Sequence, residues 1–220
     1  MFEHFKTDHD VDVLAMRARR VAIVHDMSAS CVARLMRELK AFRASPPDLA
    51  PVAHVDARDC TQWHILCEGV PNSPYEDGWY VVKITFAASY PFAAPSVRVL
   101  TPNGRFVPGQ SICMSMTEWH QEMWNPAWNV GTIVTGLLSF MAENEVTSGG
   151  MTASDEERRA LAKASVEWNA KQANIAKMFP ELTNGALEGL RFVNKGKKKS
   201  ERAESEENDA GGDVCASTGT

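Results

Sequence analysis

The chain has 220 residues, of which 44% are apolar, and a formal net charge of −5 at pH 7. This length and composition allow one substantial hydrophobic core, so we expect a single globular domain. The net negative charge argues against nucleic acid as the main partner. The five cysteines form an odd count without a regular framework, which is typical of a reducing compartment.

The beginning of the chain carries too many acidic side chains for a signal or transit peptide. We therefore interpret residues 1–27 as an N-terminal arm. The longest nearly apolar run lies within Gly131–Ala142, which is far too short to cross a bilayer. We expect no membrane span in this chain.

A helix is predicted from Ser28 or Ser30 to about Ala44, where Pro46 and Pro47 follow and prevent its continuation. Apolar residues at helical spacing define the inward face: Val32, Leu35, Met36 and Leu39. Basic residues point outward, among them Arg34, Arg37 and Lys40, and such a charged face is usually just solvated.

Three strands are predicted next, at Gln62–Val70, Tyr80–Phe86 and Ser96–Leu100. The connections between them are too short for parallel crossovers, so the pattern favours an antiparallel meander. Together with the flanking helices this indicates an α+β fold.

Cys60, His64 and Cys67 raise the alternative of a zinc site in the first of these strands. Alternation along an extended strand places His64 and Cys67 on opposite faces, and no fourth ligand follows at the usual spacing. We interpret the three as core and surface strand residues, and expect neither a metal nor a bound cofactor.

Cys113 follows two Pro/Gly turns and lies on irregular backbone, where functional residues are concentrated. A thiol is a ready nucleophile, and the side-chain amide of Asn103 could donate a hydrogen bond to a developing oxyanion. The alternatives remain open, because a single cysteine is commonly a small core residue and Asn-Gly after Pro is commonly a turn.

An amphipathic helix is predicted after Cys113, with Asn129 as its N-cap. Its buried stripe consists of Val130, Ile133, Val134, Leu137, Leu138 and Met141. A second helix is predicted from a capping box at Ser154–Glu157 to about Phe179. Beyond Leu182 the chain turns polar, and residues 194–213 are too poor in apolar surface to fold.

Four short motifs occur in order in the middle of the chain. They are Tyr90-Pro91-Phe92-Ala93-Ala94-Pro95-Ser96, Thr101-Pro102-Asn103, Ile112-Cys113 and Trp124-Asn125-Pro126-Ala127. Their order and spacing resemble the signature of ubiquitin-conjugating enzymes. In particular they resemble the branch associated with degradation at the endoplasmic reticulum, which has TPNGRF where most relatives have a His-Pro-Asn triplet.

The resemblance implies the ubiquitin-conjugating fold, which consists of an N-terminal helix, an antiparallel meander sheet, a central helix and C-terminal helices. It extends from about Ser28 to Leu182. We therefore predict a catalytic domain at 28–182, between the arm at 1–27 and a polar tail at 183–220.

The resemblance also implies the chemistry. Cys113 would accept ubiquitin from the ubiquitin-activating enzyme as a thioester, and pass it to a lysine, or to a serine or threonine hydroxyl, of a protein substrate. ATP is consumed upstream by the activating enzyme. Asn103 is the candidate oxyanion donor, although it lies ten residues before Cys113, two more than is usual, and could instead brace the loop. No general base is evident beside the thiol, and we interpret His120 as a loop residue.

Two docking surfaces are implied in the same way. In the family the first helix binds the activating enzyme, which implies roles for Arg34 and Arg37. Two rigid aromatic loops bind RING-type ubiquitin ligases, and that role is carried over to Phe92, Trp124, Pro126 and Ala127. Trp124 can equally belong to the core.

A second hypothesis is a catalytically silent scaffold with the same fold that binds ubiquitin-pathway partners. The presence of Cys113 in its motif argues against it. The similar branch ends in a hydrophobic anchoring helix, whereas Val214–Thr220 cannot insert into a bilayer. We expect either a soluble member or a truncated form, located in the cytoplasm and recruited to the endoplasmic reticulum surface, with a nuclear location as the alternative suggested by Lys195–Lys199.

Overall fold

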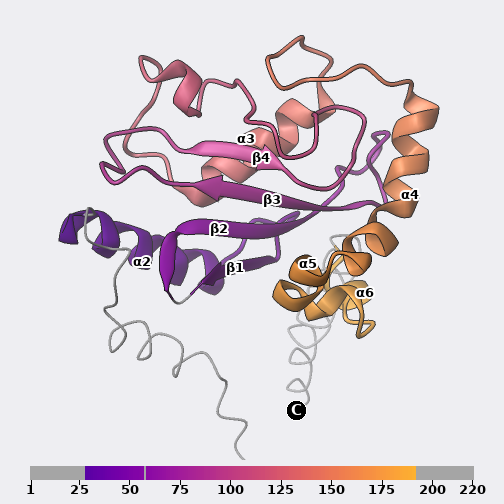
Figure 1. Cartoon of the computed structure of the whole chain (residues 1–220), viewed down its shortest axis with the longest axis horizontal. Coiled ribbons are helices and arrows are strands. Elements are labelled where there is room, and N and C mark those ends of the chain that lie inside the picture. The colour runs from indigo at the N-terminus through magenta and orange to yellow at the C-terminus, as the bar shows by residue number, and fades with distance from the viewer. Residues whose placement is uncertain (1–27, 57, 192–220) are drawn as a thin grey trace, which may run out of the picture.

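The computed structural model describes residues 28–56 and 58–191 (Figure 1). The predicted N-terminal arm lies outside the described residues. The same holds for residues 192–220, which form most of the predicted tail.

A four-stranded antiparallel sheet forms the centre of the molecule, with the strands in chain order. The strands are β1 (Val52–Asp56), β2 (Asp59–Glu68), β3 (Trp79–Thr85) and β4 (Ser96–Val99). The predicted meander and the α+β class are confirmed. Strand β1 was not anticipated, because four of its five residues are only half-buried and the strand lacks a clear apolar alternation.

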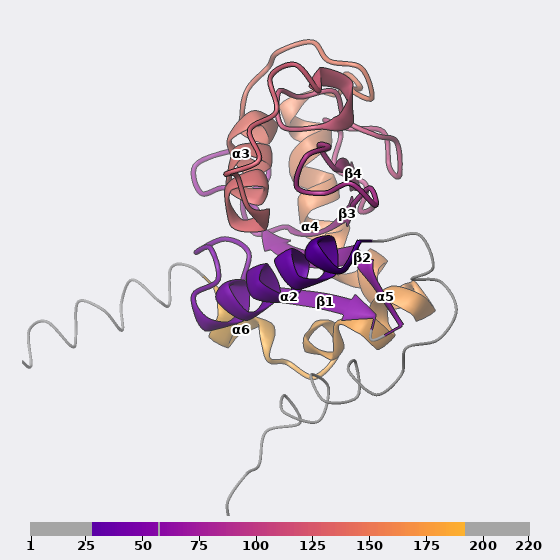
Figure 2. The same cartoon turned by 90° about the vertical axis from the view of Figure 1, so that its left-hand side faces the viewer.

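The first described helix, α2, spans Ala29–Ala44 and begins where the sequence predicts. The Ser28 hydroxyl accepts the backbone N–H of Cys31 at 3.2 Å, which satisfies one of the free donors of the first turn. Leu35 and Leu39 are buried against the sheet. In Figures 1 and 2, α2 lies beside β1 and β2.

The central helix, α3, spans Val130–Ala142, and all six predicted stripe residues are buried. The side chain of Asn129 caps it by accepting the backbone N–H of Thr132 at 3.0 Å. A Cβ added at Gly136 would lie 3.0 Å from the sulfur of Met116, so the loop that carries Cys113 packs closely on this helix.

One face of the sheet, α2 and α3 enclose the main hydrophobic core. It contains Trp63, Ile65, Val82, Ile84, Val97 and Val99 from the strands. The neighbouring residues Leu66 and Val81 point to the opposite face, as alternation along a strand requires. There they belong to a second, smaller core.

The C-terminal helices complete this second core. Helix α4 (Asp155–Lys171) begins with the predicted capping box, and α5 (Ala173–Met178) follows after a break at Gln172. The prediction of one continuous helix to Phe179 was wrong, because Gln172 has extended backbone angles of −83° and 105°. Figure 1 shows α4 at one end of the sheet, with α5 below it.

The described fold extends past Leu182, where the sequence predicted the domain to end. Helix α6 (Leu187–Leu190) follows, and Leu187 is buried in the second core. Residues 183–191 are therefore ordered, which corrects the start of the predicted polar tail. Across the described ranges 28–56 and 58–191, none of the helices combines the length and apolar character required to span a bilayer.

Candidate active site

Cys113 lies on a loop that is fixed on both sides by backbone hydrogen bonds. The preceding residue, Ile112, donates its N–H to Val97 of β4 at 3.0 Å, and Cys113 donates to Ser148 at 3.1 Å. The hydroxyl of Thr147 donates to the Cys113 carbonyl. The backbone on either side of the thiol is thus held between the sheet edge and the loop after α3.

The Cys113 side chain is half-buried and lines an open groove of about 540 Å³. The alternative that this residue is sealed in the core is therefore wrong. The groove also contains His120, and its other walls are formed by methionines, by the end of α3 and by the loop that follows it: Met114, Ser115, Met116, Met123, Gly136, Ser139, Phe140, Glu143, Glu145, Val146, Thr147 and Ser148.

A histidine and a carboxylate are aligned with the thiol. Nε2 of His120 lies 3.2 Å from the sulfur of Cys113, and Nδ1 lies 2.9 Å from Oε1 of Glu122. The hydrogen bond from His120 lowers the pKa of Glu122 from its ordinary value. A carboxylate on Nδ1 holds the neutral imidazole in the tautomer whose free lone pair is on Nε2, which faces the sulfur.

This contact corrects the expectation that no general base is evident beside the thiol, because His120 lies within hydrogen-bond reach of the sulfur. His120 is the last residue of a short 3-10 helix, Glu118–His120, and this helix places the imidazole ring beside Cys113. The signal in the sequence was the His-x-Glu spacing of His120 and Glu122. Without the turn at Thr117, whose hydroxyl bonds to the Met114 backbone, that spacing predicts nothing about the thiol.

Asn103 is fully buried and braces the turn of the TPNGRF segment. Its Nδ2 donates to the carbonyls of Thr101 at 2.8 Å and Phe106 at 3.4 Å. Its Oδ1 accepts the backbone N–H groups of Arg105 and Phe106 at 2.9 and 2.8 Å. A primary amide has two N–H bonds, and both are directed at backbone carbonyls. In this arrangement Asn103 braces the loop, as the alternative predicted, and its role as oxyanion donor stays a prediction.

The two predicted ligase-docking loops lie side by side. Phe92 is 75% exposed, and Pro126 and Ala127 are also exposed. Trp124 is only 8% exposed, and its Nε1 donates to the carbonyl of Pro91 at 2.7 Å. Its assignment as a partner contact is therefore corrected: Trp124 joins the two loops from beneath.

The two predicted arginines of α2 differ from each other. Arg37 is exposed and stays a predicted contact for the activating enzyme. Arg34 turns toward the second loop, where its Nη2 donates to the carbonyls of Trp128 at 2.9 Å and Pro126 at 3.2 Å. Its prediction as an outward docking residue is corrected, because its guanidinium is engaged within the molecule.

The chain matches the sequence profile of the ubiquitin-conjugating enzymes over residues 34–172. That is more than half of its length, so the chain belongs to the ubiquitin-conjugating enzyme family. The resemblance in the four motifs is thereby confirmed.

Curated relatives agree with this assignment. Over 156 residues the chain is 42% identical to "Probable ubiquitin-conjugating enzyme E2 33" of Arabidopsis thaliana, covering 69% of this chain and 62% of that protein. Over 150 residues it is 43% identical to "Ubiquitin-conjugating enzyme E2 6" of Debaryomyces hansenii, covering 68% and 62%. It is also 36% identical over 160 residues to "Ubiquitin-conjugating enzyme E2 J2-like" of Dictyostelium discoideum, covering 73% and 94%. The chain thus spans 62% of the length of the first two relatives.

Proposed function

We propose that this chain is a ubiquitin-conjugating enzyme that carries ubiquitin as a thioester on Cys113. The observation that supports this is the half-buried thiol in an open groove with His120 at 3.2 Å, in a chain of this family. A catalytically silent scaffold is not favoured, because a scaffold has no use for an aligned nucleophile and base.

Loading begins with the Cys113 thiol. His120 takes the thiol proton on Nε2, and the thiolate attacks the thioester that joins ubiquitin to the activating enzyme. The activating enzyme's thiolate leaves and takes up a proton. One thioester is exchanged for another, so the step is nearly neutral in energy and its rate depends on alignment.

In the transfer step the same histidine acts first as a base and then as an acid. An acceptor in the groove attacks the carbonyl carbon of the thioester, and His120 removes the acceptor's proton through Nε2. When the tetrahedral intermediate collapses, the imidazolium returns the proton to the departing Cys113 sulfur. The thiol is restored and the acceptor carries ubiquitin.

The aligned base supports hydroxyl acceptors as well as lysine. An amine that has lost its proton is already a strong nucleophile and mainly requires orientation. A serine or threonine hydroxyl remains protonated at neutral pH and gains most from a base within hydrogen-bond reach. The geometry at His120 therefore favours an enzyme whose acceptors include hydroxyl groups.

The partners in this proposal are ubiquitin, the ubiquitin-activating enzyme, a RING-type ligase and protein substrates. The exposed apolar surface at Phe92, Pro126 and Ala127 supports ligase docking. The TPNGRF segment, by its resemblance to the endoplasmic reticulum branch, supports a role in protein degradation at that membrane's cytoplasmic surface.

A loading assay tests the proposal. With activating enzyme, ATP and ubiquitin, the wild-type chain should form an adduct that thiol reagents release, and Cys113→Ala should form none. Cys60→Ala is the matched control, because Cys60 is another half-buried free thiol and should be dispensable. An adduct that persists in Cys113→Ala, or is lost in Cys60→Ala, would overturn the assignment of the nucleophile.

A further inference from the structure

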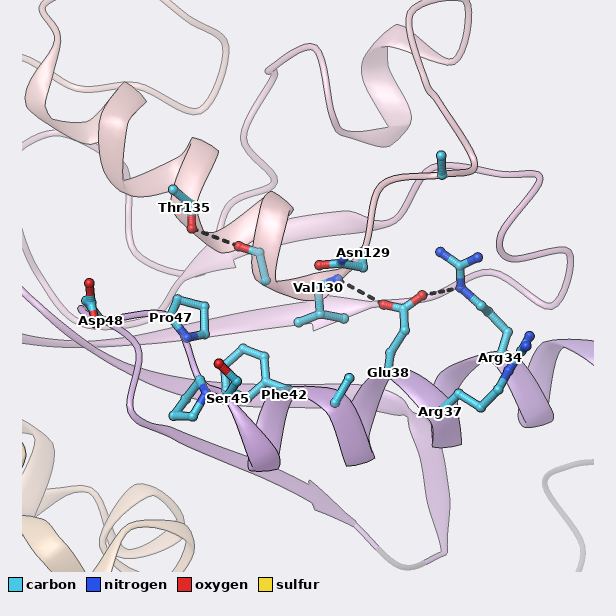
Figure 3. A pocket seen from close by; sticks show the side chains of 14 residues that line it. Arg34, Arg37, Glu38, Phe42, Ser45, Pro47, Asp48, Asn129, Val130 and Thr135 are labelled. Atoms are coloured by element: carbon cyan, nitrogen blue, oxygen red, sulfur yellow. Dashed lines mark hydrogen bonds and ion pairs between the residues drawn. The ribbon is translucent and has the colours of Figure 1, made fainter.

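Helix α2 carries a buried carboxylate on the face that packs against the core. Glu38 is 8% exposed and lies in the stripe with Leu35 and Leu39. A charge in such a position is costly unless donors surround it. Figure 3 shows the Glu38 carboxylate between Arg34 of its own helix and Val130 at the start of α3, in the wall of a pocket of about 780 Å³.

Three donors from three parts of the chain satisfy this carboxylate. Arg34 donates to Oε1 through Nε, and the hydroxyl of Tyr90 donates to Oε1 at 2.6 Å. The backbone N–H of Val130 donates to Oε2 at 2.9 Å. Glu38 therefore joins α2 to the loop that contains Tyr90 and to the end of the loop that precedes α3.

Arg34 extends the same network. While its Nε is bound to Glu38, its Nη2 reaches the carbonyls of Pro126 and Trp128. Its guanidinium carbon also lies 5.9 Å from the centre of the Tyr90 ring. The pair Glu38–Arg34 thus contacts the backbone on both sides of the exposed residue Ala127.

The exposed apolar residues of the docking face lie directly on these anchored segments. Phe92 follows Tyr90 by two residues. Pro126 carries one of the carbonyls held by Arg34, and Ala127 lies between Pro126 and Trp128, which carries the other. Trp124 links the two loops to each other through its bond to Pro91, but this bond does not fix the position of the loops relative to α2. The contacts from Glu38 to Tyr90 and Val130 fix that position.

We propose that Glu38 is the positioning residue of the docking face, fixing the separation of Phe92 from Pro126 and Ala127 and thereby the affinity for a RING-type ligase. This deepens the proposed function and rests on it where ligase binding is concerned. Glu38 itself touches neither ubiquitin nor the partner.

The groups that donate hydrogen bonds to Glu38 make its positioning role specific to a carboxylate. Val130 N–H and the Arg34 guanidinium are donors only, and a carboxylate is an acceptor only. In Glu38→Gln, one oxygen becomes an NH₂ group of nearly the same size. If the NH₂ group faces Val130, the direct bond to the start of α3 is lost. If it faces Arg34, the guanidinium that holds the carbonyls of Pro126 and Trp128 is released. In both orientations a contact that holds 124–131 is lost without a cavity being made, whereas the Tyr90 hydroxyl can accept from the amide as well as donate to it.

The first measurement is amide hydrogen exchange of the full chain with and without Glu38→Gln. We expect exchange to become ~10-fold faster in 124–131, the amount that corresponds to one lost charge-assisted hydrogen bond. Ser165→Ala is the matched control, since Ser165 is a buried hydroxyl that accepts the N–H of Trp79 in a different part of the fold. It should leave both loops unchanged.

The second measurement is discharge of preloaded ubiquitin, titrated with a purified RING domain chosen because it stimulates the wild-type chain. In Glu38→Gln the RING concentration for half-maximal stimulation should rise ~10-fold, while loading, unstimulated discharge and the saturated rate stay at the wild-type level. Glu38→Asp, which keeps the charge on a shorter side chain, should restore part of the affinity.

Unchanged exchange in 124–131 of Glu38→Gln would overturn the inference, as would a fall in the saturated rate with unchanged half-maximal concentration. The proposed function fails separately. If the wild-type chain does not load, or no RING domain stimulates it, the proposed docking role fails, whereas hydrogen exchange still decides whether Glu38 holds the 124–131 segment in place.

Discussion

At the scale of single residues, the chemistry of this protein depends on three side chains within ten residues of one another. Cys113, His120 and Glu122 form a line of two short contacts, 3.2 Å and 2.9 Å long. In the proposed mechanism the thiol is the nucleophile, the imidazole moves its proton, and the carboxylate selects the tautomer. Asn103, by contrast, acts on the backbone of its own turn.

The contribution of His120 to the reaction can be measured separately from that of the Cys113 thiol. His120→Gln should still form the thioester, because the thiol itself is retained. Discharge to a serine-containing peptide should then be slowed ~100-fold, the lower end of what a positioned base contributes, and discharge to a lysine-containing peptide by clearly less. The measurement is single-turnover release of preloaded ubiquitin, with the ester product identified by its sensitivity to mild alkali.

Glu122→Gln is the control for this prediction. It keeps a hydrogen-bond acceptor for Nδ1 but no charge, so its effect should have the same preference for the serine peptide and be smaller. Equal slowing with both peptides in His120→Gln would mean that His120 supports the loop rather than moving a proton.

At the scale of elements, strand β2 places a histidine in an environment that opposes protonation. His64 lies between His54 of β1 and Lys83 of β3 in the sheet register. Burial, followed by the charges of Lys83 and His54, lowers the pKa of His64 from 6.5 to about 4. The unfolded chain therefore binds this proton more readily than the folded chain does.

The sign of the pH dependence follows from this difference. Between pH 6.5 and 4 the unfolded state takes up a proton at His64 and the native state does not, so this residue makes the protein less stable as the pH falls through that range. In His64→Gln the loss of unfolding free energy between pH 7 and pH 5, measured by urea denaturation, should be smaller than in the wild type. An identical loss in both proteins would contradict the assignment.

At the scale of the whole molecule, two cores share one sheet. The main core joins α2 and α3 to the inner face and supports the thiol and the docking loops. The second core joins α5 and α6 to Leu66, Trp79 and Val81 on the outer face. Leu187 and Leu190 of α6 belong to this second core, and neither lines the groove at Cys113.

Removing a side chain from the second core tests that division. Leu187 is 9% exposed, so Leu187→Ala should lower the unfolding free energy by about 2 kcal/mol, at the low end for a buried leucine. Loading of Cys113 should be unchanged under conditions where the protein is folded. Val146→Ala is the matched control, because Val146 is fully exposed and its truncation should change stability by less than ~0.5 kcal/mol. Equal stability of the two variants would show that α6 is not part of the core.

Local features were predictable from the sequence because they depend on neighbours in the chain. The cap at Asn129, the capping box at Ser154 and the buried stripe of α3 all follow from side chains within a few positions. The meander followed from the short connections between strands. The motif around Cys113 predicted the family, which the comparisons confirm, and through it the proposed nucleophile.

The tertiary structure alone decided the contacts between distant segments. Glu38 meets Tyr90 across 52 positions and Val130 across 92, and no periodicity in the sequence encodes such pairs. The tertiary structure also decided that Trp124 is buried, that Arg34 turns inward and that His120 reaches the sulfur. Patterns along a chain specify which face of an element is apolar, whereas the direction of a polar side chain depends on which donors and acceptors the folded chain brings within 3 Å of it.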